Sequence, residues 1–150
     1  MSLKDKISND LKAALLSGDR FMGEVLRGLK AVILNEEIVQ GKRETGLDDS
    51  IIEQLIAREV KKRNESASLY DDANRLELSA NERAEAKIMM NYLPAQLSED
   101  DINVVVNRVI GDLGATNSSQ MGQVIGAVKK ELGNTADGAL IAKLVKNALS

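Results

Sequence analysis

The chain has 150 residues, of which 43% are hydrophobic and 29% are charged, and its net charge is −3. It contains neither cysteine nor histidine, which excludes thiol nucleophiles, disulfides, thiolate or imidazole metal ligands, and the commonest general base near neutral pH. The mild net charge argues against a protein that coats DNA or RNA with its whole surface, and no apolar run approaches the roughly 18 residues that span a membrane.

Hydrophobic residues recur with the period of an α-helix and strand-like alternation is scarce, so the sequence predicts an all-α protein. Four helices are expected before Pro94, over residues 2–17, 19–40, 48–73 and 79–93. Asp48 is expected to cap the third helix, and Gly41 to follow the second in a left-handed conformation. Ser79 and Glu82 have the spacing of a capping box for the fourth. Four apolar residues of the first helix lie at four-residue steps and are expected to face the core: Leu3, Ile7, Leu11 and Leu15.

Pro94, the only proline, marks the expected domain boundary. Its ring removes a hydrogen-bond donor and disfavours the helical conformation at Leu93. We therefore expect an N-terminal helical domain over residues 1–93 and a C-terminal domain over residues 97–150. Ser98 and the three carboxylates that follow it have the pattern of a helix start. The second domain is predicted to be a three-helix bundle, with helices over residues 98–113, 118–132 and 137–149.

Few residues are candidates for catalysis. Ser118 and Ser119 are adjacent, as in amidases of the serine–serine–lysine type, but no Gly/Ser-rich stretch is present to form an oxyanion hole. Capping of the next helix is therefore the preferred interpretation. Adjacent carboxylates on a helix diverge by about 100° and do not share a site, which applies to Glu36–Glu37, Asp48–Asp49, Asp71–Asp72 and Asp100–Asp101. We predict no catalytic residue, no metal site and no cofactor.

Two glycines lie four residues apart in the second helix of the C-terminal domain. The segment Met121-Gly122-Gln123-Val124-Ile125-Gly126 has neither the spacing of a Walker phosphate loop nor that of a dinucleotide-binding loop. The four-residue step places both glycines on one helical face. Two interpretations are open: close packing of a neighbouring helix, or close approach of a ligand backbone.

The third helix carries a basic run that consists of Arg58, Lys61, Lys62 and Arg63. Glu59 and Arg63 have the spacing and the order of a favourable ion pair along a helix. The run is interpreted as a solvated helix face that pairs within itself, with a partner-binding surface as the alternative.

A second basic set lies in the last two helices and consists of Lys129, Lys130, Lys143 and Lys146. These lysines form either a modest phosphate-binding patch or an ordinary solubilising surface. Aromatic side chains, on which unpaired bases would stack, are absent from this part of the chain. Contact with the backbone of a folded RNA is therefore the mode of RNA binding that the residues allow.

Segments along nearly the whole chain resemble a known family. The most specific of them is Tyr92-Leu93-Pro94-Ala95-Gln96-Leu97-Ser98, which falls on the expected domain boundary. The others are, in chain order, Val25-Leu26-Arg27-Gly28-Leu29-Lys30, Asn35-Glu36-Glu37-Ile38, Arg58-Glu59-Val60-Lys61-Lys62-Arg63-Asn64-Glu65-Ser66, Met121-Gly122-Gln123-Val124-Ile125-Gly126, Ala136-Asp137-Gly138 and Lys143-Leu144-Val145-Lys146. Together they resemble the GatB/YqeY family.

The resemblance implies that the C-terminal domain is similar to the tail of GatB, a subunit of the tRNA-dependent amidotransferase, where a small helical module contacts the tRNA body. That enzyme uses glutamine to amidate Glu-tRNA or Asp-tRNA, and the family is often labelled a glutamine-dependent carbon–nitrogen ligase. Its catalytic portions have no counterpart in this chain. The resemblance therefore implies a non-catalytic accessory protein, cytoplasmic and bacterial, with tRNA, an aminoacyl-tRNA synthetase or amidotransferase components as partners. A helical protein–protein adaptor without RNA contact is the alternative.

On this hypothesis the four C-terminal lysines would contact phosphate, while Gly122, Gly126 and Gly138 would allow close approach. The chain departs from the family pattern in the turn before Ala136-Asp137-Gly138, where a glycine followed by a basic residue is expected. Asn134 and Thr135 stand there instead, so one positive charge is missing from the expected RNA contact.

Charged residues within the first sixteen positions predict that no signal peptide is present.

Overall fold

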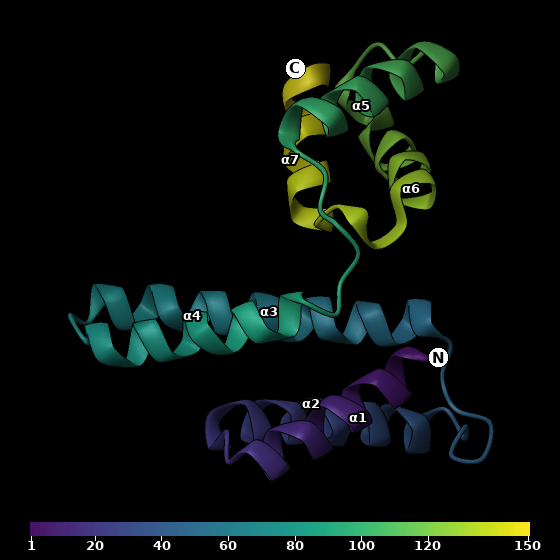
Figure 1. The fold of residues 1–150 in the computed structure, drawn as a ribbon. Helices are drawn as coiled ribbons and strands as arrows, with labels where there is room; N and C mark the ends of the chain where they lie inside the picture. Colours follow the sequence, from purple (N-terminus) through teal and green to yellow (C-terminus); the bar gives the residue numbers. More distant parts are fainter. The chain divides into compact units, whose positions relative to one another are not determined.

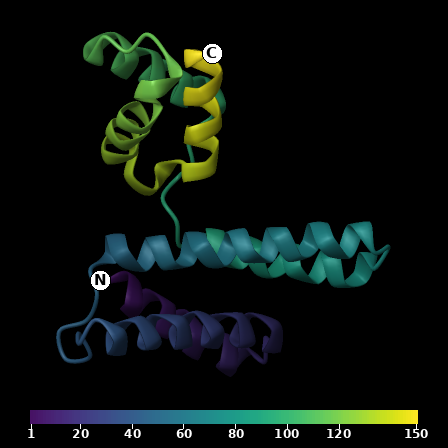
Figure 2. The ribbon, with the colours of Figure 1, turned by 180° about the vertical axis from the view of Figure 1, so that it is seen from behind.

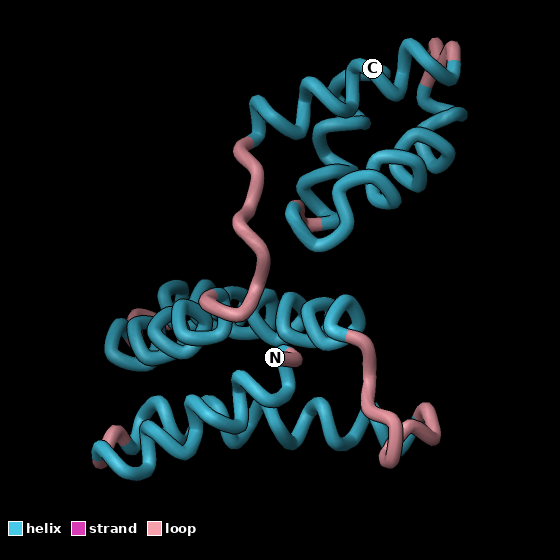
Figure 3. Tube along the Cα trace, turned by 45° about the vertical axis from the view of Figure 1, so that its right-hand side comes forward, coloured by secondary structure: helices cyan, strands magenta, loops and turns pink.

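The computed structural model describes residues 1–150. It contains seven α-helices. Figure 3 shows helices and loops but no strand, and the prediction of an all-α fold is confirmed. The helices are α1 (Leu3–Ser17), α2 (Arg20–Val39), α3 (Asp49–Asp72), α4 (Leu76–Met90), α5 (Glu99–Leu113), α6 (Met121–Leu132) and α7 (Gly138–Leu149). Two short 3-10 turns, η1 (Ser118–Gln120) and η2 (Gly133–Thr135), precede α6 and α7.

The chain divides into two compact units, Met1–Leu93 and Pro94–Ser150, and each unit has its own hydrophobic core. In the first unit, α1 and α2 form one hairpin, and α3 and α4 form a second (Figure 1). The same two layers are visible from behind in Figure 2. Because α2 contacts both α3 and α4 while α1 contacts α3, the core of this unit lies between the two hairpins.

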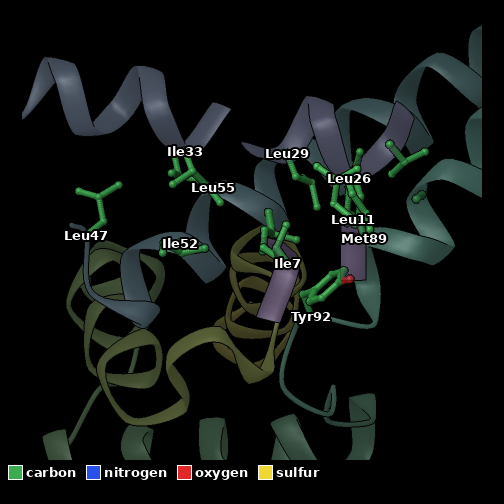
Figure 4. Packing of buried hydrophobic residues seen from close by; sticks show 14 residues of the cluster. Ile7, Leu11, Leu26, Leu29, Ile33, Leu47, Ile52, Leu55, Met89 and Tyr92 are labelled. Carbon is green, nitrogen blue, oxygen red and sulfur yellow. The ribbon is translucent and has the colours of Figure 1, made fainter. Parts of the chain in front are cut away.

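Aliphatic side chains from all four helices build the first core, together with the ring of Tyr92 (Figure 4). The predicted inward position of Leu15 is wrong, because its side chain is 51% exposed. A four-residue step turns about 40° further than one helical turn, so three such steps from Leu3 carry Leu15 away from the stripe that faces the core. The side chains that are buried almost completely are Ile7, Leu26, Leu29, Ile52, Ile56 and Met89.

The start of α4 also differs from the prediction, because this helix begins at Leu76 rather than at Ser79. Asn74 has a left-handed backbone, with φ of 58°, and the Arg75 N–H donates a 2.8 Å hydrogen bond to the Tyr70 carbonyl. This local bonding ends α3 and reverses the chain within a few residues, so the next helix starts at once. Ser79 therefore lies inside α4 with only 2% of its surface exposed, and it caps nothing.

The second unit begins as the sequence predicts. The Ser98 hydroxyl oxygen accepts a 3.2 Å hydrogen bond from the Asp101 N–H, which caps α5. The helices α5, α6 and α7 contact one another in all three pairs, which makes the unit a three-helix bundle. Its core contains residues with no exposed surface, namely Ile102, Val106, Val124, Val128, Ile141 and Val145.

The expected cap at Ser118 is corrected by one residue. Asn117 has extended backbone, and its side-chain oxygen accepts a 2.9 Å hydrogen bond from the Ser119 N–H. Ser118 is already the first residue of the η1 turn, and α6 follows from Met121. The longer reach of the asparagine side chain lets it close this tight turn one residue earlier.

Candidate functional site

The four C-terminal lysines lie on two consecutive helices of the second unit. Lys129 and Lys130 occupy the last turn of α6, whereas Lys143 and Lys146 lie on α7. All four side chains are exposed, and none of them forms an ion pair with a carboxylate of the chain. Their positive charge is therefore free to act on an anion outside the protein.

The carboxylate nearest to these lysines in the sequence is already occupied. Glu131 accepts hydrogen bonds from the Arg108 guanidinium on α5 through both of its oxygens. This contact with Glu131 holds the pKa of Arg108 above its usual value. Because Glu131 is engaged across the bundle, it does not neutralise Lys129 or Lys130.

Gly138 is brought together with Lys129. A Cβ atom at Gly138 would lie 3.1 Å from Cε and 3.2 Å from Nζ of Lys129, so the lysine side chain lies across the first turn of α7. The absence of a side chain at Gly138 thus allows this close contact. Close approach of RNA at Gly138 stays a prediction, because the group that lies against this glycine in the structure is the Lys129 side chain.

Gly122 and Gly126 have a different environment. Both are exposed, and no atom from elsewhere in the chain lies within 4 Å of the position that a Cβ would take. The helix-packing interpretation is therefore wrong within this chain. Gly122, Gly126 and Lys129 recur at steps of four and three residues and so share one face of α6. This face is an open strip without side-chain bulk, which ends at a lysine.

The turn in which a basic residue was expected, at Asn134 and Thr135, is hydrogen-bonded to the first residues of the second unit. The Asn134 carbonyl accepts a 3.0 Å hydrogen bond from Nε2 of Gln96, and the Thr135 carbonyl accepts a 2.8 Å hydrogen bond from the Leu97 N–H. Both bonds use main-chain oxygens. The turn thus has a structural role that depends on its main chain and not on a basic side chain.

The basic run on α3 does not pair as predicted. Arg63 donates a 2.9 Å hydrogen bond to Glu85 of α4, and Glu82 lies 3.9 Å away. Glu59, the expected partner, lies instead 3.4 Å from the Lys62 ammonium. Arg63 therefore joins α3 to α4 within the first unit and does not belong to a free basic surface.

Two members of that run stay free for contact with other molecules. Arg58 and Lys61 are exposed and take part in no ion pair. Lys62 is also largely exposed, although it lies beside Glu59. The predicted four-residue surface is therefore reduced to Arg58, Lys61 and Lys62.

The sequence reasoning missed a buried ion pair between α1 and α2. Glu37 is only 1% exposed, and its two carboxylate oxygens lie 2.8 and 3.0 Å from the Lys4 ammonium. The signal was present in the sequence, because Glu37 continues the four-residue spacing of the buried residues Leu29 and Ile33. An acid in a core-facing register requires a cationic partner, and Lys4 supplies it.

A second missed cluster joins α3 to α4. Arg83 donates to both carboxylate oxygens of Asp71, the shorter bond being 2.6 Å, and also to the hydroxyl of Ser79. Hydrogen bonds from Arg83 and Ser79 hold the pKa of Asp71 below its usual range. The cluster joins α3 to α4 near the tip of the hairpin. Because Asp71, Arg83 and Ser79 bond to one another, none of them is arranged as an acid or a base for a substrate.

The structure brings no candidate catalytic residues together. The Ser119 hydroxyl donates to the Asn117 side chain inside its own turn. Nowhere in residues 1–150 do three or more carboxylates converge as ligands of a metal ion. No helix combines the length and the apolar character that crossing a bilayer requires.

Relatives of this chain correct one of the expectations, which is its location. The first is 33% identical over 125 residues, which cover 79% of this chain and 65% of the relative, and it is named "Altered inheritance of mitochondria protein 41, mitochondrial" in Lachancea thermotolerans. A protein of the same name in Kluyveromyces lactis is 28% identical over 125 residues, which cover 81% of this chain and 66% of the relative. The chain thus spans just under two thirds of the length of these relatives. Their names contradict the expected cytoplasmic location, whereas the expected bacterial type stays a prediction.

The family model described as "Yqey-like protein" matches residues 4–149. The match covers both structural units, from the first turn of α1 to the end of α7. The YqeY domain is related to the C-terminal region of GatB. The chain therefore belongs to the YqeY-like protein family.

Proposed function

We propose that this chain is a non-catalytic accessory protein that binds the body of tRNA through its second unit. The observation that carries the proposal is the set of four exposed lysines on α6 and α7, none of which has a carboxylate partner in the chain. The kinship of this unit with the GatB tail supports tRNA as the polyanion. An amidotransferase or an aminoacyl-tRNA synthetase would then share the bound tRNA with it.

The residues favour contact with the RNA backbone over reading of bases. The second unit, Pro94–Ser150, contains no aromatic residue on which a splayed base could stack. Lysine ammonium groups bind phosphate as point charges, without the planar fork that reads a guanine edge. The open strip of Gly122 and Gly126 beside Lys129 would let a sugar–phosphate backbone come close to α6.

The test is binding of bulk tRNA over a series of salt concentrations. The test variant replaces Lys129, Lys130, Lys143 and Lys146 by Ala. The control variant replaces four exposed cations of the first unit that form no ion pair: Lys12, Arg20, Arg75 and Lys87. Each phosphate contact adds about one to the slope of log affinity against log salt, so the test variant should lose affinity and salt slope, whereas the control should keep most of both. Equal behaviour of the two variants, or no binding at low salt, would overturn the proposal.

A second candidate function, a protein–protein adaptor, is favoured by the first unit. Arg58 and Lys61 are exposed on α3 without ion-pair partners. Three leucines at the α3–α4 tip are also exposed, at positions Leu69, Leu76 and Leu78. An adaptor would retain a protein partner through high salt, because the exposed leucines are not screened by ions. A variant with Leu69, Leu76 and Leu78 replaced by Ser would lose that partner while its tRNA affinity stayed unchanged.

A further inference from the structure

The first unit contains a surface hollow of about 320 Å³ beside α2. This volume falls at the lower end of the range for small-molecule sites, about 300–1,000 Å³. Most of its lining surface is apolar, and Ala31, Ile33 and Leu34 contribute to it. Its polar lining includes three cations: Lys4 from α1, Lys30 from α2 and Arg43 from the loop between α2 and α3.

The charged side chains that line the hollow carry a net positive charge. One carboxylate lines it, that of Glu37, and both oxygens of this group already accept hydrogen bonds from Lys4. An ammonium has three N–H donors, so Lys4 keeps one for a ligand. Lys30 and Arg43 form no ion pair within the chain. An anion placed in the hollow would meet two uncompensated cations and a third donor.

The loop that carries Arg43 is ordered by its own backbone. The Lys42 N–H donates a 2.7 Å hydrogen bond to the Glu37 carbonyl, and the Gly46 N–H donates a 2.8 Å bond to the Lys42 carbonyl. Gly41 and Gly46 take left-handed conformations, with φ of 66° and 79°, that most other residues avoid. The backbone at Arg43 is therefore fixed before a ligand arrives, which lowers the entropic cost of binding.

We infer that this hollow binds a small anion with an apolar body, of the aliphatic carboxylate class. The cations Lys30 and Arg43 bind the carboxylate, while Leu34 and Ile33 cover the carbon chain. Inorganic phosphate or acetate would leave the apolar lining uncovered, and a neutral alcohol would leave the cations unused. This site lies in the first unit and is independent of the lysines proposed to contact tRNA.

The test uses the full chain, isotopically labelled for NMR, with sodium octanoate as the probe below its micelle concentration. We expect saturable shifts of amide signals in residues 30–34 and 41–46. Acetate and 1-octanol serve as the controls for charge and for apolar body. Both should bind at least about fivefold more weakly than octanoate, because each lacks one of the two interactions.

Two variants locate the site. Lys30→Ala combined with Arg43→Ala removes the cations and should weaken octanoate binding by about five- to tenfold. Ala31→Phe fills the hollow and should weaken octanoate and 1-octanol alike. Lys12→Ala combined with Lys87→Ala, which removes two unpaired surface cations elsewhere in the unit, should leave the affinity unchanged.

Three results would overturn the inference: no saturable shifts with octanoate, equal affinity for octanoate and 1-octanol, or equal loss in the Lys30/Arg43 and Lys12/Lys87 variants. Thermal unfolding of each variant shows that a loss of binding does not come from a loss of fold. Because tRNA binding is measured on the other unit, failure here leaves the proposed function intact, and the reverse also holds.

Discussion

The phenolic hydroxyl of Tyr92 donates a 2.6 Å hydrogen bond to Oδ2 of Asp10. This bond joins the segment just after α4 to the middle of α1. The ammonium of Lys6 lies 5.5 Å from the centre of the Tyr92 ring, at the distance of a cation–π contact. Tyr92 is itself buried and stands one residue before the end of the first unit. The end of this unit is thus fixed to its first helix.

We predict that Tyr92→Phe lowers the free energy of unfolding by about 1–2 kcal/mol, because it removes a hydrogen bond to a charged acceptor and keeps the ring. Urea unfolding followed by circular dichroism measures the change. Tyr70→Phe is the matched control, since Tyr70 is partly exposed and its hydroxyl has no partner in the chain. The control should change the stability by less than about 0.5 kcal/mol. An equal effect of the two substitutions would contradict a stabilising role for the bond to Asp10.

Alkaline pH should also unfold the chain through Tyr92. Burial, and then the hydrogen bond to Asp10, raise the pKa of Tyr92 well above its usual value. A raised pKa in the folded state gives stability that is complete below the unfolded pKa, about 10, and is lost as the pH rises above that value. In a Tyr70→Phe background, only Tyr92 can give a tyrosinate absorbance.

We therefore expect that absorbance to rise only well above pH 10, together with the loss of helical signal. The slope of stability against pH above pH 10 should be shallower in Tyr92→Phe than in the wild-type chain, because only the wild-type chain loses the stability that Tyr92 provides. A tyrosinate signal with its midpoint near pH 10 in the folded chain would contradict this prediction.

The buried ion pair of Lys4 and Glu37 gives a third prediction. Lys4→Met leaves the Glu37 carboxylate buried without a partner and should cost about 2–4 kcal/mol, near the lower limit for buried pairs because Lys4 is partly exposed. The double variant with Glu37→Leu removes both charges and should recover at least half of that loss. Urea unfolding of the single and double variants gives the coupling energy. If the double variant is no more stable than Lys4→Met, the unpaired charge is not the cause.

Arg63 and Arg58 provide a matched pair for a fourth prediction. Arg63 bonds to Glu85 across the α3–α4 hairpin, whereas Arg58 lies on the same helix without an ion-pair partner. Arg63→Ala should therefore lower the free energy of unfolding by about 1 kcal/mol, and Arg58→Ala by a few tenths at most. Equal losses in urea unfolding would show that the pairing contributes nothing and that both effects come from the helix surface.

The fold was predictable because its signals are local in the sequence. The cap of α5, for example, uses Ser98 and Asp101, which are three residues apart. The left-handed turn after α2 needs only Gly41. Errors arose where tertiary contacts compete with local signals. Ser79 has the spacing of a cap, but the bonding of Asn74 and Arg75 starts α4 earlier and places Ser79 against α3.

The spacing of a buried polar residue such as Glu37 is visible in the sequence, but the partners of the specific polar contacts could not be predicted, because they are distant along the chain. Lys4 and Glu37 are 33 positions apart, and Asp10 and Tyr92 are 82 positions apart. The local rule favoured pairing of Arg63 with Glu59, and packing of α3 against α4 provides a partner that is 22 positions away instead. The exposure of Gly122 likewise depends on which face of α6 the bundle buries.

A fifth prediction concerns the two glycines of α6, whose replacement by alanine should change the free energy of unfolding and the affinity for tRNA in opposite directions. Gly122 and Gly126 are exposed in the helix with open space around them. Alanine at each position should therefore raise the free energy of unfolding by about 0.5–1 kcal/mol, because glycine is the poorer helix former. If the strip receives the RNA backbone, the two added methyl groups should nevertheless weaken tRNA binding.

Gly28→Ala is the matched control, because Gly28 is also exposed in a helix, that of α2, with nothing near its Cβ position. It should stabilise the chain by a similar amount and leave the affinity for tRNA unchanged. Thermal unfolding and a tRNA titration on the same samples give both quantities. A more stable α6 variant with undiminished affinity would mean that tRNA, if it binds through the lysines, does not lie against Gly122 and Gly126. The contact would then be limited to the ammonium groups, and the open strip would have no part in it.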